Sequence, residues 1–147
     1  MFKANRTWML LVVLFLLWSG IASAATFYYR QEAEIWRKRY SEISESMLKI
    51  EVIIDYNNET IETYPEIYLF NGATVLDSIR AVAKVNATYW GKPFDSFLIN
   101  SVNDVVNNAG NNNRWWVYSV NGAHGQVSAD KYKLSENDVV EWIYYQY

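Results

Sequence analysis

The order of hydrophobic and polar residues divides the chain into three parts. An uncharged, mostly apolar run extends from Thr7 to Tyr29. From Lys49 onward, apolar and polar residues alternate in short segments, as they do in half-buried strands. Between these parts, apolar residues recur at the spacing of one helix face, at Trp36, Tyr40, Ile43 and Met47. The pattern predicts an N-terminal transmembrane helix within 1–29, a helical stalk over 30–48 and a folded domain over 49–147.

The first part is long enough to cross a membrane. An α-helix rises about 1.5 Å per residue, so roughly 20 apolar residues span a hydrocarbon core. Trp8 and the Phe27-Tyr28-Tyr29 run lie at its two ends, as interfacial aromatic residues do, and Lys3 and Arg6 favour a cytoplasmic start. We expect an uncleaved anchor through residues 7–29. Signal-peptide cleavage after Ala22-Ser23-Ala24 is the alternative, and both interpretations place the domain outside the cytoplasm.

The stalk has one apolar face, and its charged residues occupy the other faces. We expect this helix to lie on its own domain. A short coiled-coil seam between two protomers is the alternative, although fewer than three heptads are present.

The domain is predicted to be α+β, with one helix packed on a mixed sheet. The helix is expected over 74–86, because Thr74 and Asp77 have the spacing of a capping box and Gly91-Lys92-Pro93 forbids continuation. The polar loop 107–113 is interpreted as a solvated connection, with a ligand-facing lip as the alternative. The predicted strands are 49–56, 60–69, 97–99, 105–106, 114–120 and 139–145.

The last third of the chain carries two strands rich in aromatic residues. Alternation places Trp116 and Tyr118 on one face of the first strand and Trp115 on the other. The helix can cover only one face of the sheet, so we expect one of Trp115 and Trp116 to be substantially exposed, with the 107–113 loop beside it. The expected ligand-binding residues are Trp115, Trp116, Tyr118, Trp142 and Tyr144.

The residue types present exclude several kinds of chemistry. Without cysteine, the chain has no disulfide, zinc ribbon or thiol nucleophile. With His124 as the only histidine, a metal site with two imidazole ligands is excluded within one chain. No nucleophile elbow surrounds a serine, and the glycines form no phosphate-binding loop. We therefore expect no metal, no cofactor and no enzymatic activity.

Charge and glycosylation motifs add two expectations about partners. Residues 49–147 contain seven Lys or Arg and twelve Asp or Glu, so we expect no binding to nucleic acid, which needs clustered positive charge. Asn58-Glu59-Thr60 and Asn86-Ala87-Thr88 have the sequence of N-glycosylation sites, so Asn58 and Asn86 are candidate acceptors on the outer side of the membrane.

Several motifs in order give the domain a family resemblance. It resembles the transcobalamin C-terminal-like domain, a prokaryotic domain of unknown function that is related to the small β-domain of cobalamin carriers. The resemblance covers about 49–147. The motifs are Gly72-Ala73-Thr74-Val75-Leu76-Asp77, Phe97-Leu98-Ile99-Asn100-Ser101-Val102, Trp115-Trp116-Val117-Tyr118-Ser119-Val120-Asn121-Gly122, Tyr132-Lys133-Leu134 and Asp138-Val139-Val140-Glu141-Trp142.

The resemblance implies a β-grasp-like mixed sheet with one packed helix, in an extracytoplasmic setting. Membrane-anchored archaeal versions of the domain look like this chain. Two features depart from the pattern: the large helical domain of the carriers is absent, and Asn137 replaces the glycine that is usual before Asp138. Asparagine tolerates a positive φ almost as well as glycine does.

The sequence therefore predicts a single-pass protein of the cell membrane whose C-terminal domain faces outward and binds a small ligand. A cobalamin-like ring and a glycan are the two candidate ligands, because exposed aromatic rings can stack on either. The alternative is a structural or assembly subunit of a cell-surface complex. Such a subunit would pack through its aromatic face against other surface proteins or against a second copy.

Overall fold

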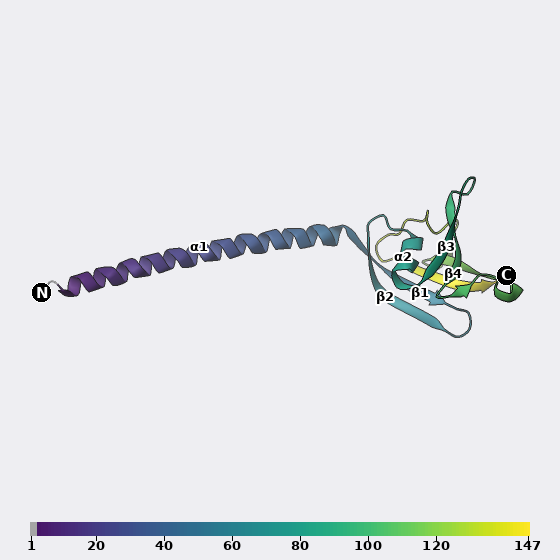
Figure 1. Cartoon of the computed structure of the whole chain (residues 1–147), viewed down its shortest axis with the longest axis horizontal. Helices are drawn as coiled ribbons and strands as arrows, with labels where there is room; N and C mark the ends of the chain where they lie inside the picture. Colours follow the sequence, from purple (N-terminus) through teal and green to yellow (C-terminus); the bar gives the residue numbers. More distant parts are fainter. Residues whose placement is uncertain (1–2) are drawn as a thin grey trace. The chain divides into compact units, whose positions relative to one another are not determined.

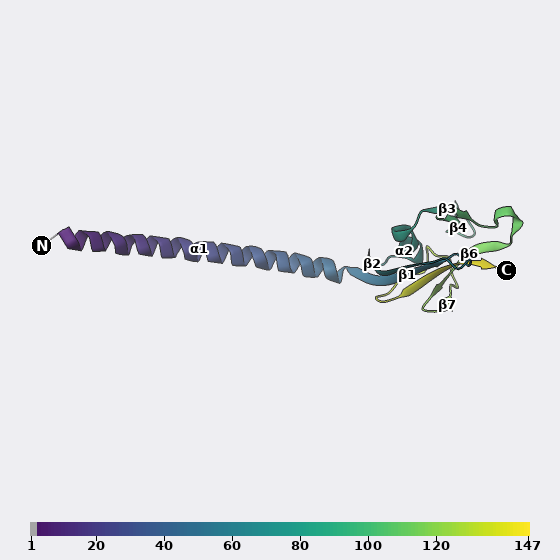
Figure 2. The same cartoon turned by 90° about the horizontal axis from the view of Figure 1, so that it is seen from below.

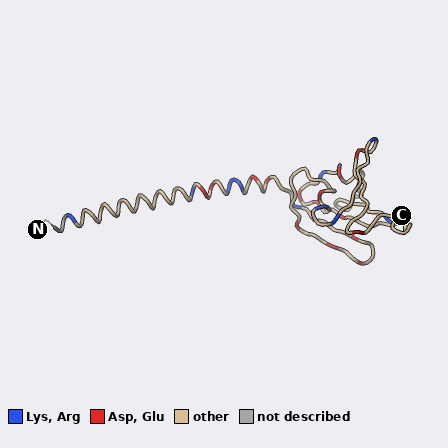
Figure 3. The backbone as a smooth tube through the Cα atoms, in the orientation of Figure 1, with Lys and Arg blue, Asp and Glu red and all other residues tan. Residues whose placement is uncertain are grey.

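The computed structural model describes residues 3–147, which form two compact units (Figure 1). The first unit ends at Ser44 and the second spans Glu45–Tyr147. The first consists of helix α1 (Lys3–Glu45), which contains a segment long and apolar enough to cross a membrane, with a mean hydropathy of 2.2. Figure 3 shows the long uncharged stretch of this helix. An N-terminal signal sequence would meet the same criteria of length and composition.

The stalk prediction extends too far at its C-terminal end. The helix ends at Glu45, and Met47, which was placed on the stalk's apolar face, is the first residue of strand β1 (Met47–Asp55). Strand pairing explains the earlier boundary, because Leu48 lies buried in the domain core and Met47 pairs with Phe70.

A five-stranded mixed sheet forms the base of the second unit. Its strand order is β2-β1-β8-β6-β7, where β2 spans Ile61–Phe70, β6 Arg114–Val120, β7 Ala123–His124 and β8 Val139–Gln146. The β1–β8 pair is parallel, and the other pairs are antiparallel. The predicted α+β class and the adjacency of the two aromatic strands are confirmed. Asn137, in the turn before β8, has φ 64 and so adopts the positive φ expected for it.

The predicted helix is shorter than expected, and a strand that the sequence analysis missed follows it. Helix α2 (Val75–Val82) begins with the predicted capping box, in which Thr74 and Asp77 each accept a hydrogen bond from the other's main-chain N–H. The backbone becomes extended at Ala83. The β-branched and aromatic residues of 85–90 then favour strand over helix. A three-stranded sheet results, with order β3-β4-β5 and bounds Val85–Trp90, Ser96–Val102 and Val105–Val106.

Both α2 and the three-stranded sheet cover the same face of the five-stranded sheet (Figure 2). The core between these layers contains Val52 and Ile54 from β1, Ile79 from α2, and Val102 from β4, together with large rings from β6 and β8. The opposite face of the sheet is only half-buried along β1 and β8. One hydrophobic core therefore stabilises both sheets.

Leu76 tests the packing of α2. Its side chain is 1% exposed, so we expect Leu76→Ala to lower the free energy of unfolding by about 2–5 kcal/mol, the usual cost of truncating a buried leucine. Urea unfolding measures this loss. The control is Ile61→Ala on β2, where the side chain is 61% exposed and the change should stay within about 0.5 kcal/mol. Equal, small losses for the two variants would contradict the packing described.

Two buried tyrosines predict how stability depends on pH. Burial raises the pKa of Tyr118 above its ordinary value of 10.0, and burial likewise raises the pKa of Tyr56. Both phenols stay neutral in either state at lower pH, but above about pH 10 they ionise first in the unfolded chain. We therefore expect stability to fall as pH rises above about 10. Urea unfolding across this pH range should show a smaller loss of stability for Tyr118→Phe than for the unsubstituted protein. An equal loss in both would show that the Tyr118 phenol does not cause it.

Candidate functional site

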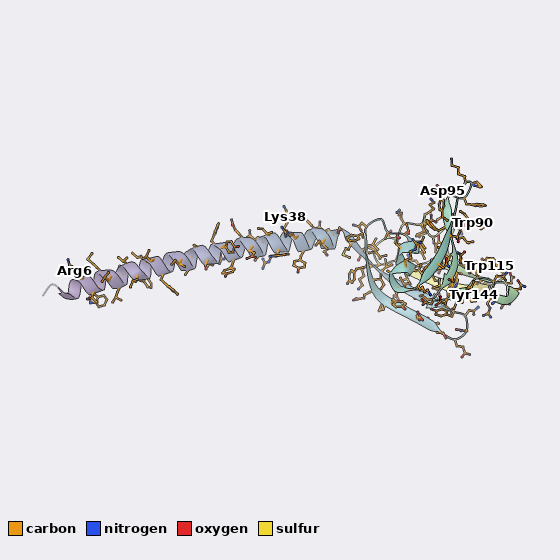
Figure 4. All side chains as sticks on the ribbon, viewed as in Figure 1. Arg6, Lys38, Trp90, Asp95, Trp115 and Tyr144 are labelled. Atoms are coloured by element: carbon orange, nitrogen blue, oxygen red, sulfur yellow. The ribbon has the colours of Figure 1, made fainter. Side chains whose placement is uncertain are left out.

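An open cleft lies between the β3–β4 hairpin, the β6 and β8 strands and the loop after β7. Its volume is 620 Å³. Figure 4 labels Trp90 and Asp95 on the hairpin, and Trp115 and Tyr144 on β6 and β8. The cleft is lined by Trp90, Phe94, Ser96, Phe97, Leu98, Ile99, Trp116, Val117, Tyr118, His124, Gly125, Ser128, Ala129, Trp142, Tyr145 and Tyr147. Most of these side chains are aromatic or aliphatic, so the cleft suits a ligand with an apolar surface.

Three of the five predicted ligand-binding residues line this cleft. Trp116, Tyr118 and Trp142 lie on the covered face of the five-stranded sheet, where they are 7%, 8% and 1% exposed. The rings of Tyr118 and Trp142 pack with their centroids 5.6 Å apart. These residues supply an apolar wall of the cleft, but they offer little free surface of their own.

One of Trp115 and Trp116 was expected to be substantially exposed; Trp116 is buried, at 7% exposed, and Trp115 is half-buried. The cause is the packing of the three-stranded sheet on this face; the sequence analysis predicted strands at β4 and β5 but neither β3 nor this packing. Trp116 Nε1 donates a hydrogen bond to the Val105 carbonyl at 2.8 Å, and the Tyr144 hydroxyl donates to the Val106 carbonyl at 2.7 Å. Strand β5 therefore holds both rings in place.

Trp115 and Tyr144 do not line the cleft with the other three predicted residues. Trp115 pairs with Tyr145 across the β6–β8 ladder, and Trp116 with Tyr144. Because successive side chains of a strand point to opposite faces, Trp115 lies on the half-buried face and Tyr144 beneath β5.

The exposed rim of the cleft comes from residues that the sequence analysis missed. Trp90 and Phe94, from the β3–β4 hairpin, are 47% and 64% exposed, and their ring centroids lie 5.6 Å apart. The sequence did contain a signal for this hairpin, because two aromatic residues flank the turn-forming Gly91-Lys92-Pro93 segment.

The loop after β7 closes the cleft around the Tyr118 ring. The Tyr118 hydroxyl donates a hydrogen bond to the Val127 carbonyl at 2.6 Å. Gly125 lies against the face of the ring, so that a Cβ atom at this position would come within 2.2 Å of the Tyr118 Cζ atom. Only glycine fits here without displacing the ring. His124, beside it, is exposed and lines the cleft.

Asn107 joins the two sheets at one end of the cleft. Its side-chain oxygen accepts a hydrogen bond from the Trp116 main-chain N–H at 2.7 Å, and its Nδ2 donates to the Ile99 carbonyl at 2.5 Å. Its own main-chain N–H donates to the Asn100 carbonyl. The first residue of the 107–113 loop thus has a structural role that neither sequence interpretation anticipated, whereas residues 109–113 are exposed.

The polar groups around the cleft are few. The Tyr89 hydroxyl donates a hydrogen bond to Asp95, and this bond raises the pKa of Tyr89. Lys131 Nζ lies 3.9 Å from the Asp95 carboxylate. Within residues 3–147, no group of three or more His, Asp and Glu side chains could hold a metal ion.

One buried donor at the cleft lacks a partner. The Trp142 indole N–H is buried, and no described residue accepts a hydrogen bond from it. An unpaired buried donor costs about 1–3 kcal/mol.

Both candidate glycosylation residues are exposed. Asn58 lies in the turn between β1 and β2, where its side-chain oxygen accepts a hydrogen bond from the Thr60 N–H. Asn86 lies on β3, and its side-chain oxygen accepts a hydrogen bond from Asn100. Their exposure leaves the prediction of glycosylation open.

Solved structures that share the fold of the domain include two proteins. A candidate metal-binding protein from Ruminococcus gnavus matches with a TM-score of 0.50 and 18% identity, over 68% of this chain and 98% of that protein. Haptocorrin in complex with Cbi matches with a TM-score of 0.50 and 18% identity, over 68% of this chain and 26% of haptocorrin. No curated protein matches the chain in sequence.

These likenesses are consistent with the resemblance to the β-domain of cobalamin carriers, and at this identity they show the fold alone. Sequence similarity to a family covers most of the same domain. Residues 72–146 match the family described as Domain of unknown function (DUF4430), and the chain belongs to that family.

Proposed function

We propose that this chain is a membrane-anchored, outward-facing module that binds a small ligand with a flat apolar surface. The cleft of 620 Å³ is the observation that carries the proposal, because small-ligand sites are typically concave, mostly apolar and of about 300–1,000 Å³. The exposed rings of Trp90 and Phe94 would contact the ligand from the hairpin. The buried rings of Trp116, Tyr118 and Trp142 would form the wall behind it.

The structural neighbours support a ligand-binding role. Haptocorrin was solved in complex with Cbi, and the Ruminococcus protein is a candidate metal-binding protein. A β-grasp-like domain with a cleft beside its last strands is consistent with the ligand-binding roles of both proteins. A cobalamin-like ring and a glycan remain the two ligand classes proposed, because either can stack on the Trp90 ring.

Binding without catalysis fits the side chains of the cleft best. His124 is the only imidazole there, and the other polar side chains in the lining are Ser96, Ser128 and the tyrosines. General acid–base catalysis uses a side chain that is held within hydrogen-bond reach of the reacting group and has a suitable pKa. The proposal therefore assigns recognition, and no reaction, to this cleft.

Assembly with another protein is a second candidate function, favoured by a separate surface. Strand β2 is an edge of the five-stranded sheet, and Ile61, Tyr68 and Phe70 on it are largely exposed. A long edge strand with exposed apolar residues can pair with another chain. This surface lies on the opposite edge of the sheet from β6 and the cleft, so the two functions are separable by mutation.

The anchor proposal has a direct test. We expect an uncleaved chain in the membrane, because the apolar segment of α1 has aromatic residues at both ends. Intact-mass measurement on protein extracted from membranes should return the mass of the full sequence. A mature chain that begins at Ala25 would show instead that the segment is a cleaved signal peptide.

The binding proposal is tested with Trp90→Ala. We expect this change to weaken ligand binding by about tenfold, because a stacked ring contributes roughly 0.5–1.5 kcal/mol beyond its buried area. Folding should change by less than about 1 kcal/mol, since the ring is at the surface. Titrations of the full-length chain with Cbi and with a panel of oligosaccharides, followed by tryptophan fluorescence, measure the affinity.

Tyr68→Ala is the matched control. It removes a similarly exposed ring from β2, outside the cleft, and should leave the affinity unchanged. If the two substitutions change the affinity for a ligand equally, that ligand binds outside the cleft.

A further inference from the structure

The outer edge of β6 carries the main-chain groups on which the inference rests. The even-numbered residues of β6 direct their main-chain N–H and C=O groups away from β8. This is shown by the Trp116 N–H, which donates to Asn107, and by the Arg114 and Tyr118 carbonyls, which accept from the N–H groups of Asn108 and Gly125. Because β6 and β8 pair without a register shift, the odd-numbered residues bond to β8.

Nearly all of this edge is capped by other parts of the domain. At one end, Asn107, Asn108 and Asn112 satisfy the Trp116 N–H and both main-chain groups of Arg114. At the other end, Val120 pairs with Ala123 in β7, and the Gly125 N–H bonds to the Tyr118 carbonyl. The edge is therefore blocked at both ends against pairing with another strand.

One adjacent acceptor and donor remain between these caps. Within the described part of the chain, β7 pairs only with Ser119 and Val120, and even-numbered residues of β6 face away from β8. Outside these ladders, no described hydrogen bond reaches the Trp116 carbonyl or comes from the Tyr118 main-chain N–H. Trp116, Val117 and Tyr118 all line the cleft. Successive side chains alternate between faces, so three consecutive lining residues mean that the edge of the strand itself borders the cleft.

This pair has a specific chemical complement. In an extended peptide, the N–H and C=O of one residue point to the same side, and those of its neighbours point to the other. A single residue beside Val117 could therefore donate its N–H to the Trp116 carbonyl and accept from the Tyr118 N–H. Parallel strands use this arrangement, in which one residue bonds to the two residues that flank its partner.

We propose that this cleft also binds an extended peptide segment that pairs one residue with the open edge of β6. The proposal rests on the binding function proposed for the cleft, and it adds a peptide to the cobalamin-like ring and the glycan as a third ligand class. The caps limit pairing to a single residue, so the segment is short, and the aromatic rings of the hairpin and of the wall select apolar flanking side chains. Main-chain bonds would supply affinity, and the ring-lined walls would supply selectivity.

A blocked tripeptide is the probe that tests this pairing. The full-length ¹⁵N-labelled chain in detergent micelles is titrated with N-acetyl-Ala-Trp-Ala-methylamide. A second titration uses the same peptide with a methyl group on the main-chain nitrogen of its tryptophan. Methylation removes the donor that would reach the Trp116 carbonyl. We expect the methylated peptide to bind about tenfold more weakly, since an unmade hydrogen bond costs about 1–3 kcal/mol.

Amide hydrogen exchange reports the pairing at the strand itself. In the free protein, the Tyr118 N–H should exchange quickly although it lies within a strand, whereas the Val117 N–H, which bonds to β8, should be protected. At saturating tripeptide, exchange at Tyr118 should slow by at least about tenfold, which is the protection expected from one added hydrogen bond. Exchange at Val117 should not change, so Val117 is the internal control.

Three results would overturn the inference, and they separate it from the binding function. If both peptides bind equally and the Tyr118 N–H is not protected from exchange, the peptide does not pair with the edge of β6. If neither peptide binds but Cbi or an oligosaccharide does, and Trp90→Ala weakens that binding, the cleft is a ligand site of different chemistry. If no probe binds, the proposed function fails as well.

Discussion

The domain depends on its last strand being the central one. In the order β2-β1-β8-β6-β7, β8 is hydrogen-bonded to the first strand of the domain on one side and to β6 on the other. Its Trp142 ring is almost fully buried, and Val140 and Tyr144 complete the same buried face. Without these residues, β1 and β6 have no common partner strand, so the sheet depends on β8.

Local chemistry explains the parts of the fold that the sequence predicted. Thr74 and Asp77 act within a single turn, so their capping box is visible in four residues and forms as expected. The β6 and β8 strands follow from alternation, and the Asn121-Gly122 turn directly after β6 adopts positive φ at both positions. Such features depend only on residues that are close together in the sequence, so they can be predicted from one sequence alone.

The parts that the sequence did not predict depend on contacts between distant residues. Whether Trp116 is buried depends on β5, a strand of two residues that lies over its ring. Residues 85–90 include β-branched and aromatic side chains that favour a strand, but a strand forms there only because β4 pairs with it. No sequence motif marks the open main-chain pair of β6. The pair stays open because, along this edge, Asn107 bonds only to the Trp116 N–H on one side of it and Gly125 only to the Tyr118 carbonyl on the other.

The hairpin between β3 and β4 separates recognition from stability. Its tip carries the exposed rings of Trp90 and Phe94, while its base is fixed by pairing of Val85 with Val102, which lies in the core. Surface loops tolerate substitutions and changes of length far better than buried strands do. Relatives with the same core could therefore diversify at residues 91–95 alone, and each new tip would present a different rim to the same wall of rings. Selection on binding could then proceed almost independently of selection on folding.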